Sequence, residues 1–142
     1  MTPEPRIALP LSPLLVASAA GILPVCGLLA LLGVMLGRAG PFLSASLGTA
    51  LVALGAALLA TFASVPWIAK PASTAMLAWT AGSMLRLLLT AAGAFLLYSA
   101  PPSGWLHGVG EARAPFLLAV ATAYLAGLLA EVGVVARILR QT

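Results

Sequence analysis

Residues 75–98 read AMLAWTAGSMLRLLLTAAGAFLLY, and this run of 24 residues contains a single charge, Arg86. A helix of this length extends about 36 Å at 1.5 Å per residue, which is enough to cross a bilayer core about 30 Å thick. The run does not alternate between polar and apolar residues, as a membrane-spanning strand of about 10 residues would. We therefore predict a transmembrane helix here.

Three further stretches of similar length are equally apolar. Of the ten charged residues in the chain, only Arg86 and Glu131 lie well inside the four stretches, and the others lie near their ends or between them. The sequence therefore predicts an all-α integral membrane protein of one domain, residues 1–142, with four transmembrane helices as two antiparallel hairpins. The predicted helices cover about 13–36, 42–65, 75–98 and 115–139.

The composition of the 142 residues agrees with this class. Only 7% of the residues are charged, against roughly 25% in an average soluble domain, and 62% are hydrophobic, with a mean hydropathy of +1.13. A soluble enzyme and a disordered chain are thereby excluded, and the lipid bilayer is the first predicted partner. The net charge is +4, but the basic residues are scattered singly, so we predict no nucleic-acid partner.

The basic residues also predict the orientation. With four helices, both termini and the middle connection lie on one side of the membrane. That side holds Arg6, Lys70, Arg137 and Arg140, and the other side holds Arg38 and Arg113. The positive-inside rule then favours an N-in, C-in topology. The predicted interfacial anchors on the inner side are Trp67, Lys70, Arg137 and Arg140.

The two intramembrane charges lie on stripes of small residues. Residues four apart share a helix face, and small residues allow helices to approach closely in lipid. The two charges lie at similar depths in antiparallel helices, and each side chain leans towards the other because helical side chains point towards their N-terminus. We infer an ion pair between Arg86 and Glu131. The predicted packing faces consist of Ala78, Gly82 and Thr90 in the third helix and Ala119, Ala123 and Gly127 in the fourth.

Three roles remain open for this ion pair: fixing the helix register, contacting a partner protein, or taking part in a proton or ion pathway. The polar residues near it, Ser83, Thr90, Thr122 and Tyr124, do not ionise at neutral pH. Cys26 is the only cysteine and His107 the only histidine, so neither belongs to a recognisable metal or catalytic motif. The sequence predicts no catalytic residues, no metal site, no cofactor and no enzyme activity.

The run from Trp79 to Thr90 resembles the ATP synthase protein I family, the small I subunit of bacterial F-type ATP synthases. Members of this family have about this length and carry a glycine followed four residues on by a basic residue, as Gly82 and Arg86 do here. The chain departs from the family at Ser83, where an acidic residue is often found. The resemblance covers about residues 70–140, including the segment from Tyr124 to Arg140.

This resemblance implies a non-enzymatic accessory protein of the bacterial cytoplasmic (inner) membrane. It implies a role in the assembly or stability of the rotor ring, with c-subunit helices as partners and a link to proton transport. One alternative is a structural accessory subunit of another large membrane complex, respiratory or photosynthetic. A second is a small proton-coupled transporter, although such proteins resemble one another in a first-helix glutamate that this chain lacks.

Overall fold

The computed structural model describes residues 4–64, 69–101 and 106–141. Four long helices are each long and apolar enough to cross a membrane, so the chain has the architecture of a multi-pass α-helical membrane protein. They are α1 (Leu11–Met35), α2 (Ala39–Ser64), α3 (Ala72–Ser99) and α5 (Arg113–Leu139). The shorter elements are the helix α4 (Leu106–Glu111) and the two strands β1 (Arg6–Ile7) and β2 (Lys70–Pro71).

The long helices begin two or three residues earlier than the sequence predicts. In α1, α2 and α5 the earlier start places a proline at the third helical position: Pro13, Pro41 and Pro115, respectively. A proline is accepted in the first turn because the N–H group that it lacks would have no acceptor within the helix. The prolines therefore lie inside these helices, although two of the predicted starts coincide with them.

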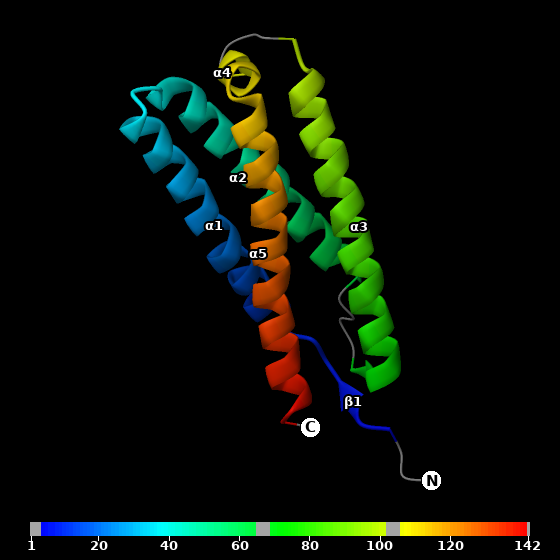
Figure 1. Cartoon of the computed structure of the whole chain (residues 1–142). Helices are drawn as coiled ribbons and strands as arrows, with labels where there is room; N and C mark the ends of the chain where they lie inside the picture. Colours follow the sequence, from blue (N-terminus) through cyan, green and yellow to red (C-terminus); the bar gives the residue numbers. More distant parts are fainter. Residues whose placement is uncertain (1–3, 65–68, 102–105, 142) are drawn as a thin grey trace.

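The four long helices alternate in direction (Figure 1). One end of the bundle, here called the terminal end, carries both chain termini, and the distal end carries α4 and the turn between α1 and α2. In this turn Gly37 has a φ of +67°, a conformation that glycine adopts without a steric penalty. The turn allows α1 and α2 to pack as a close antiparallel hairpin.

The second pair of long helices, α3 and α5, is packed together less closely than α1 and α2. Although α3 and α5 follow each other in the chain, α3 packs mainly on α2 and α5 packs mainly on α1. The helix α2 is the most buried of the four, and it contacts every other helix. Most of its small residues are buried and serve packing within the bundle, as Gly48 shows: a Cβ there would lie 3.2 Å from Phe116 of α5.

The prolines Pro3, Pro5 and Pro10 predict an irregular tail over residues 1–12, whereas residues 4–10 of the structure contain a short strand and two buried side chains. Strand β1 pairs with β2 in antiparallel register, and Ile7 and Leu9 are buried at the terminal end between α3 and α5. The carboxylate of Glu4 accepts hydrogen bonds from the Ser73 N–H (2.7 Å) and hydroxyl (3.1 Å). It thus caps the first turn of α3, which has no acidic residue of its own.

Candidate functional site

The structure brings Arg86 of α3 and Glu131 of α5 together as an ion pair inside the bundle. Nη1 of Arg86 contacts Oε1 of Glu131, and the two side chains are only 3% and 7% exposed. Both residues lie on the inward faces of their helices. Each charge therefore compensates the other in a region where an isolated charge would be costly.

A third residue, Ser18 of α1, completes this site. Its hydroxyl donates a hydrogen bond to the same Glu131 oxygen that contacts Arg86. The carboxylate thus connects three helices: its own α5, α3 through Arg86, and α1 through Ser18. Ser18 is not among the residues predicted from the sequence, although it is the only residue with a hydroxyl group within 13–36.

The guanidinium of Arg86 also lies near an aromatic ring. Its Cζ is 5.7 Å from the centroid of the Tyr124 ring, within the range of a cation–π contact. The Tyr124 hydroxyl donates to the Ser83 carbonyl at 3.4 Å, and the Thr90 hydroxyl donates to the Arg86 carbonyl at 2.8 Å. Three of the four neighbouring polar residues named from the sequence therefore surround Arg86. Thr122 does not, because it is exposed and donates to the carbonyl of Leu118.

The small-residue stripes make room for the ion pair in a way that the sequence did not predict. A Cβ at Gly127 would collide with Nη2 of Arg86 and lie 3.2 Å from Cγ1 of Ile22 in α1. A Cβ at Gly82 would lie 2.6 Å from the Cβ of Ser64 in α2. Each glycine thus packs against the α1–α2 hairpin, and the Arg86 side chain crosses the wider space between α3 and α5.

The other members of these stripes also face inwards. Ala119, Ala123 and Thr90 are buried, and Ala78 is half-buried. Ala123 belongs to a packed cluster with Ile22 of α1, which agrees with the close contact between α5 and α1. The predicted packing faces therefore contribute mainly to contacts with the first hairpin.

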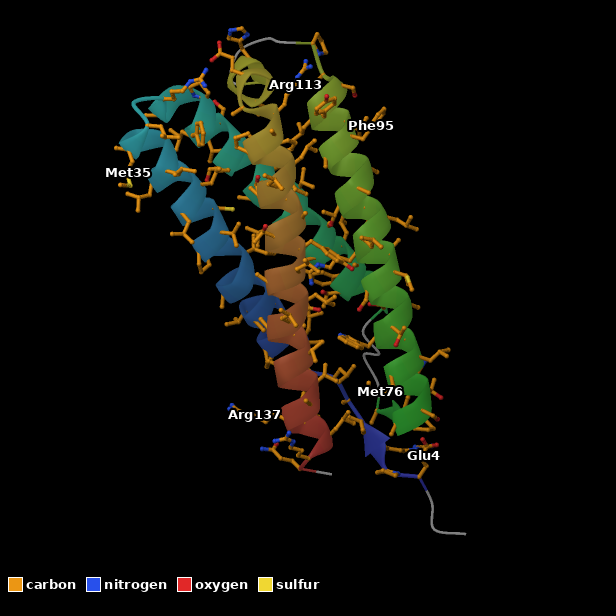
Figure 2. The ribbon with its side chains drawn as sticks, in the orientation of Figure 1. Glu4, Met35, Met76, Phe95, Arg113 and Arg137 are labelled. Atoms are coloured by element: carbon orange, nitrogen blue, oxygen red, sulfur yellow. The ribbon has the colours of Figure 1, made fainter. Side chains whose placement is uncertain are left out.

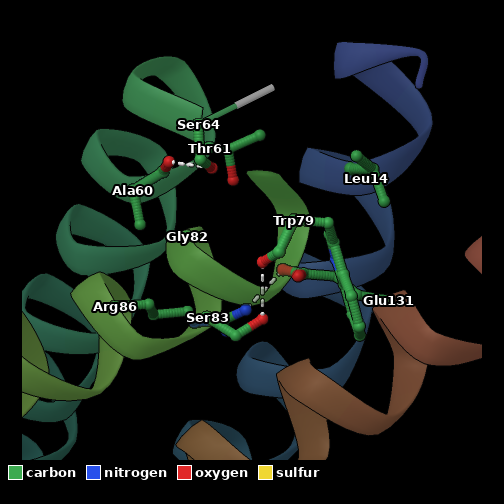
Figure 3. Close-up of a pocket in the computed structure, with 9 residues that line it drawn as sticks. All are labelled: Leu14, Ala60, Thr61, Ser64, Trp79, Gly82, Ser83, Arg86 and Glu131. Carbon is green, nitrogen blue, oxygen red and sulfur yellow. Dashed lines mark hydrogen bonds and ion pairs between the residues drawn. The ribbon is translucent and has the colours of Figure 1, made fainter. Parts of the chain in front are cut away.

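A small cavity lies beside the ion pair and is bordered by all four long helices (Figure 3). Its volume is about 10 Å³, so it has room for no more than about one water molecule. Three buried N–H groups have no acceptor within the described part of the chain: Nε and Nη2 of Arg86, and Nε1 of Trp79, another residue that borders the cavity. The site is polar but too small for an organic substrate.

The predicted interfacial anchors lie away from the ion pair and its neighbouring residues. Trp67 falls outside the described residues. Lys70 in β2, Arg137 in the last turn of α5 and Arg140 directly after it are exposed near the terminal end. These three residues lie where the headgroup region would meet the bundle if the terminal end faces a membrane surface.

The remaining chemically reactive side chains are dispersed. His107 and Glu111 form an exposed pair on α4, with Nε2 and Oε1 3.2 Å apart. Cys26 is buried as a free thiol, and its backbone carbonyl accepts a hydrogen bond of 2.8 Å from Ser46. Within residues 4–64, 69–101 and 106–141, no three His, Cys, Asp or Glu side chains are grouped so that they could hold a metal ion.

Comparisons of the chain with protein-family models, with curated proteins and with solved structures find no match. The buried cluster and the outward surfaces of the helices are therefore the basis of the functional proposal. The cluster is Ser18, Arg86, Tyr124 and Glu131, and it is called the charge cluster below.

The contribution of Ser18 to the stability of the bundle can be measured by substitution. Ser18→Ala removes a hydrogen bond to an ionised group, and we expect a loss of about 1.5–3 kcal/mol in the free energy of unfolding. Ser12→Ala is the matched control, because Ser12 is exposed at the start of the same helix. Unfolding in mild detergent would be followed by circular dichroism. Equal stability of the two variants would show that Ser18 does not stabilise the carboxylate.

Proposed function

We propose that this protein is a non-enzymatic accessory protein of the bacterial cytoplasmic membrane that assists the assembly or stability of the rotor ring of an F-type ATP synthase. The observation that carries the proposal is the ion pair between Arg86 and Glu131. Because both charges are buried and compensate each other, they act within the bundle and fix the positions of α3 and α5. The chain is then a rigid helical body that acts through its surface.

The outward surface supports a role in binding other membrane helices. Large apolar side chains are exposed along all four long helices, for example Leu28, Leu51, Leu88 and Leu129. The helix α3 has the smallest buried share of the four, so it presents the widest outward face. Such a face suits contact with lipid or with the apolar helices of a larger complex.

The resemblance to ATP synthase protein I supports the choice of complex. The two residues that match the family motif, Gly82 and Arg86, are both structurally demanding positions in this fold. Gly82 has no room for a Cβ beside Ser64, and Arg86 forms the ion pair. The motif therefore coincides with the packing of α3 on α2 and with the charge cluster. The partners in this proposal are the helices of the c subunits.

We further propose that the terminal end faces the cytoplasm, which gives the N-in, C-in topology of two antiparallel hairpins. The basic residues support this orientation. Four of the six outside the charge cluster lie at the terminal end, and two lie at the distal end: Arg6, Lys70, Arg137 and Arg140 against Arg38 and Arg113. The larger number is expected on the cytoplasmic side.

The yield of assembled rotor rings tests the proposed function. The c subunit from the same organism would be expressed with the wild-type chain, with Arg86→Ala, with Glu131→Ala, or without the chain. We expect severalfold fewer rings without the chain and with either variant, because unpairing the buried charge weakens the bundle. Arg137→Ala is the control, since this exposed residue of α5 lies outside the charge cluster. Immunoblots would normalise each yield to the amount of protein.

Three outcomes would contradict the proposal. An unchanged ring yield without the chain would remove the assembly role. Stable, stoichiometric co-purification with a different membrane complex would favour a structural subunit instead. Proton-coupled uptake by vesicles that contain only the purified chain would favour a transporter.

A further inference from the structure

An apolar groove runs along the outward side of the bundle between α3 and α5. It exists because the two helices pack on different members of the first hairpin and have little contact with each other. Its volume is about 670 Å³, and its lining is almost entirely apolar. Alanines, including Ala91 and Ala121, alternate along it with large exposed side chains such as Phe95 and Leu125, so the groove has a narrow base between bulky edges.

On the inner side, the lining of the groove ends at the level of the charge cluster. Tyr124 lines the groove at this level, its ring lies over Arg86, and its hydroxyl donates to Ser83. The groove therefore does not continue to the terminal end. It occupies only the distal half of the bundle, between the middle of the membrane and the start of α5.

The length of the groove corresponds to the thickness of the hydrocarbon layer of one leaflet. On α3 its lining extends from Leu87 to Tyr98, which is about 16 Å at 1.5 Å per residue. Half of a bilayer core is about 15 Å. A partner helix crosses the full membrane thickness and would match only half of its length to the groove. An acyl chain of a phospholipid in the distal leaflet matches the whole groove.

A cation lies at the outer end of this groove. Arg113 begins α5, and its Cζ is 5.0 Å from the centroid of the Tyr98 ring, which lines the groove. Figure 2 shows Arg113 near the distal end of the bundle, with Phe95 below it on α3. Within the described residues Arg113 forms no ion pair, and the nearby Glu111 pairs with His107. An exposed guanidinium at this level matches the phosphate of a lipid headgroup.

We propose that the groove between α3 and α5 binds one anionic phospholipid from the distal leaflet, with an acyl chain along Ala91 and Ala121 and the phosphate at Arg113. The inference does not depend on the partner proposed above. The bound lipid would fill the space between the two helices, which have little contact with each other. It would thereby stabilise α3, the least buried of the long helices, against α5.

The test uses the purified full chain in detergent, freed of lipid. It is titrated with phosphatidylglycerol and, separately, with phosphatidylcholine of the same acyl chains, and native mass spectrometry counts the bound lipids. We expect one phosphatidylglycerol to bind more tightly than any further lipid. Arg113→Gln is expected to weaken this binding about fivefold, as for one basic residue at a membrane surface, and to weaken the binding of phosphatidylcholine less, because its choline group compensates the phosphate charge. Arg38→Gln, at the same end of the bundle, is the control.

A second pair of variants tests the groove itself. Ala121→Phe places a ring in the groove and is expected to weaken the binding of both lipids at least tenfold. Ala92→Phe adds the same ring to an exposed position of α3 outside the groove lining and is expected to have no effect. Thermal unfolding without lipid would show that both variants remain folded.

Three results would overturn the proposal. In the first, Ala121→Phe binds lipid as the wild type does. In the second, Arg113→Gln keeps the preference for phosphatidylglycerol. In the third, photocrosslinking from Ala91 in native membranes captures the helix of another protein and no lipid.

Discussion

Replacing Glu131 with alanine is expected to lower the free energy of unfolding by about 3–5 kcal/mol, the largest effect that we expect of a single substitution in this chain. The variant leaves the guanidinium of Arg86 buried without a carboxylate, and it removes the acceptor of the Ser18 hydrogen bond. Unfolding of the purified protein in mild detergent would measure the loss. Arg137→Ala, an exposed substitution on the same helix, is expected to change the stability little.

A double-mutant cycle shows whether this loss comes from the pair. Arg86→Leu and Glu131→Leu are each expected to be strongly destabilising, because each leaves the opposite charge unpaired. The double variant removes both charges and is expected to be more stable than either single variant. Losses that simply add would show that the two charges do not interact energetically, in contradiction to the contact between Nη1 and Oε1.

The second large effect is expected at Gly21 in α1. A Cβ at this position would lie 2.5 Å from the carbonyl oxygen of Ala126 and 2.8 Å from the Cα of Gly127 in α5. Both are backbone atoms, so the helices themselves would have to separate. We expect Gly21→Ala to lower the free energy of unfolding by about 1–3 kcal/mol, the usual range for overpacking.

Gly27 offers the matched control for this substitution. It lies in the same helix and is exposed, and a Cβ added there would have no side chain within 4 Å among the described residues other than its two chain neighbours, and no described atom of a neighbouring helix. Gly27→Ala is therefore expected to be neutral or slightly stabilising, because alanine favours the helix over glycine. Thermal unfolding of the two variants in the same detergent would compare them. Equal behaviour would contradict the close approach of α1 and α5.

The helices and the two charges are the part of the site that the sequence predicts well. Long apolar runs and two isolated charges are local features, and a helical repeat is enough to place Arg86 and Gly82 on one face. The structure adds Ser18, which lies 113 residues from Glu131 in the chain. No local pattern relates such distant residues, so only the packing of α1 on α5 brings them together.

Two further features of the structure could not be predicted from the sequence, because they also depend on contacts between distant parts of the chain. The N-terminal prolines predict an irregular tail, but Ile7 and Leu9 are buried and Glu4 caps α3 from a distance of 69 residues along the chain. The stripes of small residues also leave their partners undetermined: in the structure Gly82 lies against Ser64 of α2, and Gly127 lies against Ile22 of α1 and the Arg86 side chain of α3. In both cases the packing of the whole chain, and not the local sequence, determines which residues come into contact.

The amino-acid sequence is enough to count the helices that are long and apolar enough to cross a membrane, because the thickness and low polarity of the bilayer require long apolar runs with few charges. Which helices contact one another follows only from the packing of the whole bundle. In lipid, every helix face is apolar, so hydrophobicity does not mark the contacts, and the choice is made by close packing at small residues such as Gly21 and by the charges of Arg86 and Glu131. The divergence of α3 from α5, and with it the groove at Arg113, is a consequence of that packing.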